Sequence, residues 1–120
     1  MIYDQHRAAF SNVSAYVVMH DGARVATVAI KYPRDGAGRL YAYVHWLGVP
    51  MVRGFAAGGG YDKRSAACAS ATRKLPEHLP AGYDAAADVY RSFVDVMRTD
   101  GGQDWNTALT RAGFTVLQAV

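Results

Sequence analysis

The first half of the chain has the hydrophobic pattern of an antiparallel meander. Residues 12–20 and 23–32 are rich in strand-forming side chains, and the intervening Asp21-Gly22 is the two-residue signal of a tight hairpin. A turn-forming cluster rich in glycine follows. Residues 39–47 then alternate aromatic or polar side chains with apolar ones, as a half-buried strand does. The pattern therefore predicts three consecutive antiparallel strands joined by turns.

A loop and a helix are predicted for the middle of the chain. Residues 49–60 include a proline and a run of adjacent glycines, which favour sharp turns or close approaches of the backbone, so we expect a loop there. Asp62 can cap the following helix, because its carboxylate accepts hydrogen bonds from the first backbone amides. The helix is expected to end near Leu75, since a proline follows.

Two more helices and a last strand are predicted for the remaining sequence. From about Asp84, apolar residues recur at the spacing of an amphipathic helix. This apolar stripe consists of Ala86, Val89, Tyr90, Phe93, Val94 and Met97. A short helix is expected over about residues 103–112, with Gly113 as its C-terminal cap. Residues 114–120 form an apolar strand that must pair with the sheet to bury its side chains.

Together these elements predict an α+β fold in a single domain, residues 1–120. The expected sheet is antiparallel with three to four strands, the meander plus the C-terminal strand, and three helices pack mainly on one of its faces. A short helical segment over residues 3–10 is expected before the first strand. A chain of this length buries a sizeable core without disulfides or metal ions.

The charge is distributed unevenly along the chain. Lysine and arginine number 13 and aspartate and glutamate 10, which gives a net charge of +3, but residues 1–80 are strongly basic and residues 81–120 slightly acidic. A basic surface attracts phosphate backbones or acidic protein surfaces. The single cysteine, Cys68, excludes an intrachain disulfide, and no apolar run has the length of a membrane span. We therefore expect a cytoplasmic protein without a membrane partner.

One face of the third predicted strand is a candidate binding surface. Alternation places Tyr41, Tyr43 and His45 on one face and the apolar residues between them on the other. Beside Arg39, such a face is suited to stacking on bases or on a flat partner surface. The competing interpretation is that one face is core and the other is covered by helices. The predicted partner-binding residues are Arg39, Tyr41, Tyr43, His45, Arg53, Tyr61, Lys63 and Arg64.

No pattern of residues indicates catalysis, a metal ion or a cofactor. The histidines lack paired ligand spacing, and Cys68 has no cysteine or histidine at helical distance. The glycine run is not a Walker loop, because two residues separate Gly60 from Lys63. Residues 53–60 resemble the pyrophosphate loop of acetyltransferases, with a different spacing from arginine to glycine, which implies a small acyltransferase as a distant third function. We expect a non-enzymatic protein with no cofactor and no metal.

Two features resemble RNA-binding domains. Residues 39–46 are similar to the first ribonucleoprotein motif of RNA-recognition domains, although Asp21-Gly22 leaves no room for the helix that those domains place between their first two strands. The order of a short helix, three strands and a basic-tipped helix is similar to that of double-stranded RNA-binding domains. There the second helix begins with lysines that meet phosphates, a place taken here by Lys63 and Arg64. This resemblance implies a nucleic-acid-binding module as the alternative function.

Two further segments resemble small accessory proteins of phages and integrated mobile elements, some of which are anti-CRISPR proteins. They are residues 57–67, AGGGYDKRSAA, and residues 112–120, AGFTVLQAV, with Asp104-Trp105 between them. The resemblance implies a non-enzymatic inhibitor that occupies a surface of a bacterial CRISPR–Cas effector complex, or of its nuclease, in the host cytoplasm. Nucleic acid is the alternative partner, and the type of CRISPR system stays open.

Overall fold

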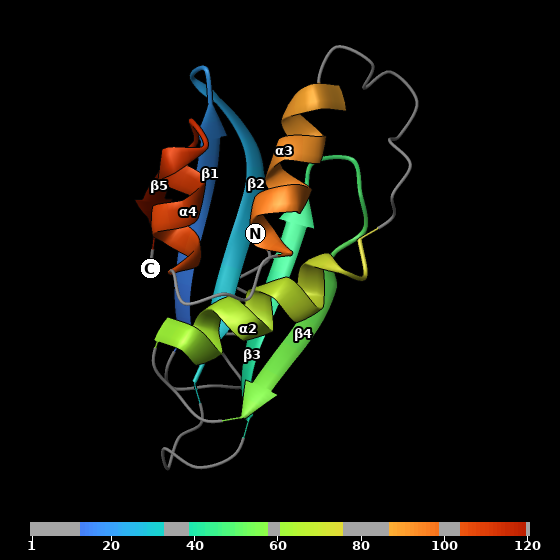
Figure 1. Ribbon diagram of the computed structural model, residues 1–120, viewed down its shortest axis with the longest axis vertical. Helices are drawn as coiled ribbons and strands as arrows, with labels where there is room; N and C mark the ends of the chain where they lie inside the picture. Colours follow the sequence, from blue (N-terminus) through green and yellow to red (C-terminus); the bar gives the residue numbers. More distant parts are fainter. Residues whose placement is uncertain (1–12, 33–38, 58–60, 76–86, 99–103, 120) are drawn as a thin grey trace.

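A single antiparallel sheet with helices on one side organises the protein (Figure 1). The structure is a computed structural model, and it describes residues 13–32, 39–57, 61–75, 87–98 and 104–119. The strands are β1 (Val13–His20), β2 (Ala23–Lys31), β3 (Arg39–Trp46), β4 (Val52–Ala57) and β5 (Thr115–Gln118). The helices are α2 (Tyr61–Thr72), α3 (Ala87–Met97) and α4 (Trp105–Arg111). The sheet has five strands in the order β4-β3-β2-β1-β5, which confirms the predicted α+β class.

The β1–β2 hairpin forms as the sequence predicts. Asp21 and Gly22 have φ angles of 50° and 78°, and this pair of left-handed residues makes the kind of turn whose twist matches the strands on either side. The strands pair directly from the turn, with His20 opposite Ala23, and a register shift follows between Val18 and Met19. The hairpin register decides which side chains face the helices.

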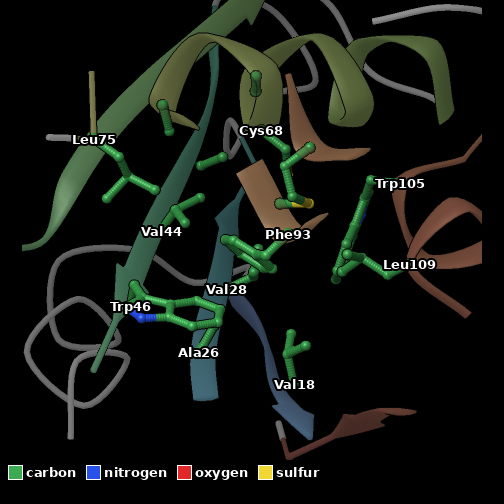
Figure 2. Packing of buried hydrophobic residues seen from close by; sticks show 14 of the residues in the cluster. Val18, Ala26, Val28, Val44, Trp46, Cys68, Leu75, Phe93, Trp105 and Leu109 are labelled. Carbon is green, nitrogen blue, oxygen red and sulfur yellow. The ribbon is translucent and has the colours of Figure 1, made fainter. Parts of the chain in front are cut away.

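Alternation along β3 separates the two faces of the sheet. Leu40, Ala42, Val44 and Trp46 are fully buried in the main core, as the sequence pattern predicts. Figure 2 shows Trp46 and Val44 pointing toward the helices, among labelled core residues from the neighbouring elements. Tyr41 and Tyr43 belong instead to a separate small cluster with Ala15 and Ala29. These are the residues of the opposite face, so the predicted division of β3 is confirmed.

A fourth strand occupies part of the segment that was expected to be a loop. Residues 52–57 form β4 and pair antiparallel with β3, so the prediction of a loop over residues 49–60 is wrong for this part. Gly54 explains both why a strand forms here and why the sequence pattern did not predict it. A Cβ at Gly54 would lie 2.1 Å from the Ala71 amide nitrogen and 2.5 Å from the Ala67 carbonyl oxygen, so only glycine lets α2 approach β4 this closely.

The three helices cover one face of the sheet and enclose the main core (Figure 1). α2 lies across β3 and β4, and its alanines and Cys68 provide the small side chains that its close approach needs. Phe93 from α3 packs against Trp46 with ring centres 5.0 Å apart, and Trp105 from α4 packs edge-on against Tyr16 at 5.0 Å. Fully burying one such side chain contributes about 1.5–3 kcal/mol, so this layer carries most of the stability.

The C-terminal elements agree with the sequence pattern. α4 ends before Gly113, whose φ of +97° suits a helix cap, and Phe114 is buried behind it. β5 pairs with β1, with Val17 opposite Leu117, so the predicted last strand does join the sheet. Among the described residues, no helix has the length and apolar character needed to cross a membrane.

The start of α2 differs from the prediction, and two other predicted helix starts lie outside the described residues. α2 begins at Tyr61, so Asp62 lies within the helix and the prediction that Asp62 caps it is wrong. The amphipathic helix predicted from Asp84 is described from Ala87 onward as α3. The helical segment expected over residues 3–10 lies outside the described residues.

Candidate binding surface

The sheet face away from the helices is buried in its middle and accessible along one margin. Ala15 and Ala29 are fully buried, and Lys31 and Tyr43 are 3% and 7% exposed. The Lys31 ammonium donates a hydrogen bond of 3.3 Å to the Tyr43 hydroxyl and lies 4.7 Å from the centre of its ring. These side chains are withdrawn from solvent, whereas more exposed side chains of this face lie where β3 and β4 run side by side.

Four side chains form that accessible surface, called here the β3–β4 margin. They are Arg39, Tyr41, Arg53 and Phe55. Arg39 and Arg53 are exposed, Phe55 is 43% exposed, and Tyr41 is half-buried. Phe55 therefore brings exposed aromatic surface to the margin, next to the ring of Tyr41.

The register of β3 and β4 brings the margin residues into contact. Tyr41 lies directly opposite Phe55, and their ring centres are 6.3 Å apart with the planes tilted by 58°. The Arg39 guanidinium lies over the Phe55 ring, 4.4 Å from its centre, and the Arg53 guanidinium lies 5.3 Å from the centre of the Tyr41 ring. Both contacts are diagonal across the strand pair, within reach of long side chains. A pair of aromatic rings therefore carries a guanidinium group at each end.

A third cation reaches the margin from the end of α2. The Lys74 ammonium donates a hydrogen bond of 2.9 Å to the Arg53 carbonyl and lies 5.9 Å from the centre of the Phe55 ring. This carbonyl belongs to β4, which is an edge strand of the sheet. Placing a lysine there also protects an edge strand from pairing with another chain.

The margin lies in a positive electrostatic environment. The five strands contain Arg24, Lys31, Arg39 and Arg53 but no aspartate or glutamate. Where side chains are described, carboxylates lie in the β1–β2 turn and on or next to α3 and α4, away from the margin. A cationic surface with aromatic rings attracts anionic partners that also present flat or apolar groups.

His45 lies on the same face as the margin but contributes no charge at neutral pH. It is opposite Thr27, which is buried, and His45 itself is partly buried. Burial lowers the pKa of the His45 imidazole below its usual 6.5, and the positive charge of Arg24 lowers it further. His45 is therefore a neutral hydrogen-bonding group in this environment.

The two basic residues predicted at the start of α2 lie on the helical side of the sheet. The Arg64 guanidinium donates a hydrogen bond of 3.4 Å to the Tyr32 hydroxyl, which packs against the main core. Ser65 accepts a hydrogen bond of 3.0 Å from the Trp105 amide, so the first turns of α2 lie beside α4. Lys63 is exposed there, and Figure 1 shows the opposite end of α2 beside β4. The side chain of Tyr61 lies outside the description.

The structure thus divides the predicted site residues into two groups. Arg39, Tyr41 and Arg53 come together in the margin, with Tyr43 and His45 on the same face, whereas Lys63 and Arg64 belong to the helical layer. Phe55 and Lys74 are additional candidates that the sequence pattern missed. Phe55 fell in an expected loop and Lys74 at the end of a helix, so only the pairing of β4 with β3 reveals them.

Cys68 and the possible metal ligands were the remaining candidates for chemistry in the described part of the chain. Cys68 is fully buried, and burial raises the pKa of its thiol far above the usual range, which keeps it protonated and unreactive. Where the structure describes the chain, no group of three or more histidine, cysteine, aspartate or glutamate side chains is arranged to hold a metal ion. The segment that resembles an acetyltransferase pyrophosphate loop is residues 53–60. Its residues 53–57 are part of the edge strand β4.

Comparisons with known proteins give no match: no family model, no curated protein and no solved structure is similar to this chain. Function is therefore inferred from the surface itself and from the two sequence segments described above.

Proposed function

We propose that this protein is a non-enzymatic inhibitor of mobile-element origin that blocks a bacterial CRISPR–Cas effector complex, or its nuclease, by occupying one of its surfaces. The observation that carries the proposal is the β3–β4 margin, where two arginines flank a pair of aromatic rings. Aromatic and arginine side chains are the residues that most often dominate binding energy at interfaces. The choice of target rests on the resemblance of residues 57–67 and 112–120 to small accessory proteins of phages and integrated mobile elements, some of which are anti-CRISPR proteins.

The margin is suited to occupancy because its groups are already held in place. Arg39 is stacked on Phe55 and Arg53 on Tyr41, so less side-chain freedom is lost when a partner binds. A specific interface buries about 1,200–2,000 Å² in total, which is larger than these four side chains. The margin is therefore the anchor of an interface whose rim extends over neighbouring parts of the sheet edge.

Stoichiometry distinguishes occupancy from catalysis. An inhibitor that acts by contact silences about one complex per molecule, so inhibition of DNA cleavage by a purified effector should be complete near a 1:1 ratio. The effector should keep its mass, which intact-protein mass spectrometry measures. Inhibition far below a 1:1 ratio together with a mass shift on the effector would contradict the proposal.

Charge reversal locates the surface that meets the effector. The double variant Arg39→Glu/Arg53→Glu should weaken inhibition by at least about tenfold, the loss of an arginine anchor being on the order of 1–2 kcal/mol. Reversal of Arg91 and Arg111 to glutamate is the charge-matched control, because both are exposed cations on α3 and α4. Lys63→Glu tests the start of α2, where the sequence also predicts contact with a partner. If Lys63→Glu abolishes inhibition and Arg39→Glu/Arg53→Glu does not, the interface is the start of α2 instead of the margin.

A nucleic-acid-binding module is the second candidate function. The observation in its favour is the placement of cations beside aromatic rings on a sheet surface, a combination that suits phosphates and bases. The likeness to double-stranded RNA-binding domains is weaker in the folded chain, because β4 lies between the meander and the basic helix. A partner lost from a lysate pull-down after nuclease treatment would favour this function over the first.

A further inference from the structure

We propose that the β3–β4 margin binds single-stranded nucleic acid, with Tyr41 and Phe55 stacking on bases and the neighbouring cations binding phosphates. This inference rests on the second candidate function proposed above, nucleic-acid binding, and names the class of nucleic acid that the margin meets. It makes no use of the type of CRISPR system.

The ring pair provides the base-binding part of the site. Tyr41 and Phe55 come from adjacent strands and are held opposite each other by the register of β3 and β4. Phe55 is 43% exposed although it contacts Tyr41 and two cations, so part of this aromatic side chain stays in water. Stacking a base on an exposed ring buries apolar area on both partners and tolerates any base, because every base has a flat face.

The cations provide the phosphate-binding part of the site. Arg39 and Arg53 lie at opposite ends of the ring pair, and Lys74 lies 5.9 Å from the Phe55 ring centre. A guanidinium stacked on a ring still directs its N–H groups outward from the guanidinium edge, where they match the paired oxygens of a phosphate. The strands bring no aspartate or glutamate to oppose them.

The combination favours a single strand over the other anionic partners. In a duplex the base faces are stacked on each other, so Tyr41 and Phe55 would meet no base. An acidic peptide would satisfy the arginines, but it would cover the exposed Phe55 ring only where it also carries an apolar side chain. A single strand offers both phosphates and free base faces, which matches a margin in which a pair of rings has a cation at each end.

Binding of a fluorescein-labelled oligothymidylate of 15 nucleotides, followed by fluorescence anisotropy, tests the inference. We expect saturable binding at 50 mM salt that weakens steeply as salt rises, and much weaker binding to a duplex of the same length at each salt concentration. Arg39→Gln and Arg53→Gln should each weaken binding and lower the salt slope by about one. Arg111→Gln is the matched control, because Arg111 is an exposed cation on α4.

Substitution of the rings separates stacking from general charge attraction. Phe55→Ala should weaken oligothymidylate binding by at least about tenfold. Phe55→Leu keeps much of the apolar bulk without the flat ring and should weaken binding nearly as much. Leu117→Ala is the control, because Leu117 is 52% exposed on the opposite edge strand. Equal binding of duplex and single strand, or full binding by both Phe55 variants, would overturn the inference.

The outcomes for the inference and for the proposed function are distinguishable. Tight oligothymidylate binding without inhibition of any effector would leave the inference in place and remove the proposed function. Stoichiometric inhibition by a protein that fails to bind the oligonucleotide at 50 mM salt would support the function and overturn the inference, assigning an acidic protein surface to the margin. A urea unfolding curve for each variant confirms that lost binding is not lost folding.

Discussion

The two faces of β3 differ in what their side chains do. On the helix-covered face, Val44 and Trp46 are fully buried among apolar neighbours. On the other face, Tyr41 is half-buried and contacts Phe55 and Arg53 near the edge of the sheet. Complete burial contributes about 1.5–3 kcal/mol per side chain, whereas an exposed cation–ring contact contributes about 0.5–1 kcal/mol. One strand thus stabilises the fold with one face and, with Arg39 and Tyr41 on the other, contributes to the proposed binding surface.

This division explains how a small protein combines a stable fold with a surface that is free to bind. Substitutions in the margin change exposed contacts, which have small effects on the free energy of unfolding. Substitutions on the helix-covered face change a close-packed interior, where a lost side chain leaves a cavity. Variants on each face therefore separate effects on folding from effects on binding.

The largest expected effect follows from emptying the helix-covered face. Trp46→Ala removes a fully buried ring that packs against Tyr90 and Phe93, with ring centres 5.2 and 5.0 Å away. We expect it to lower the free energy of unfolding by about 3–5 kcal/mol in urea denaturation. Tyr41→Ala, on the same strand but the other face, should cost markedly less. Equal losses in the free energy of unfolding for the two variants would show that both faces of β3 contribute equally to stability.

Gly54→Ala tests the closeness of α2 and β4 and ranks next. Its new methyl group would meet the backbone of Ala67 and Ala71, which moves only if the helix moves. We expect a loss of about 3 kcal/mol in the free energy of unfolding, the upper end of the range for overpacking. Gly22→Ala is the control, because a Cβ there has no atom within 4 Å and only its φ of +78° is strained. A smaller loss for Gly54→Ala than for Gly22→Ala would contradict the packing of α2.

Substitution of Cys68 tests the core and has an expected effect of intermediate size. Cys68→Ser places a hydroxyl at a fully buried position and should cost about 1–2 kcal/mol, near the lower end of the usual range for burying such a group. In the native protein the thiol should react with Ellman's reagent only at the rate at which the protein opens, and rapidly in urea. Fast native labelling would place Cys68 at the surface. Binding should be unchanged in the serine variant, because the residue lies in the helix-covered core.

The smallest expected effect is the pH dependence of stability that comes from His45, which lies on the face of β3 away from the helices. Its pKa is lowered in the folded protein by burial and by Arg24, so the unfolded chain binds the proton more strongly. The stability that neutral His45 contributes is therefore complete above pH 6.5 and is lost as the pH falls through the lowered pKa. Comparing urea unfolding at pH 7.5 and 5.5, the wild type should lose more stability than His45→Gln. An equal loss would mean that His45 is solvated.

Several elements were predictable because their signals are local. The turn between β1 and β2 follows from Asp21-Gly22, whose left-handed angles the sequence alone implies. The two faces of β3 follow from strict alternation, and α3 from its apolar stripe. β4 was not predictable in this way, because Arg53, Gly54 and the two alanines after Phe55 have weak strand preference. That segment becomes a strand through its pairing with β3 and its contact with α2.

The sequence by itself determined the meander, the amphipathic helix α3, the terminal strand and the basic character of the strands, since each depends on residue types at short spacing. Only the tertiary structure decided which of the candidate binding residues meet. Arg39, Phe55 and Lys74 are far apart in the chain, and the edge pairing of β4 brings them together. Lys63 and Arg64 lie closer to Arg53 in sequence than Arg39 does, yet the crossing of α2 places them on the helical side. Contacts between distant residues depend on the packing of whole elements, which no local pattern records.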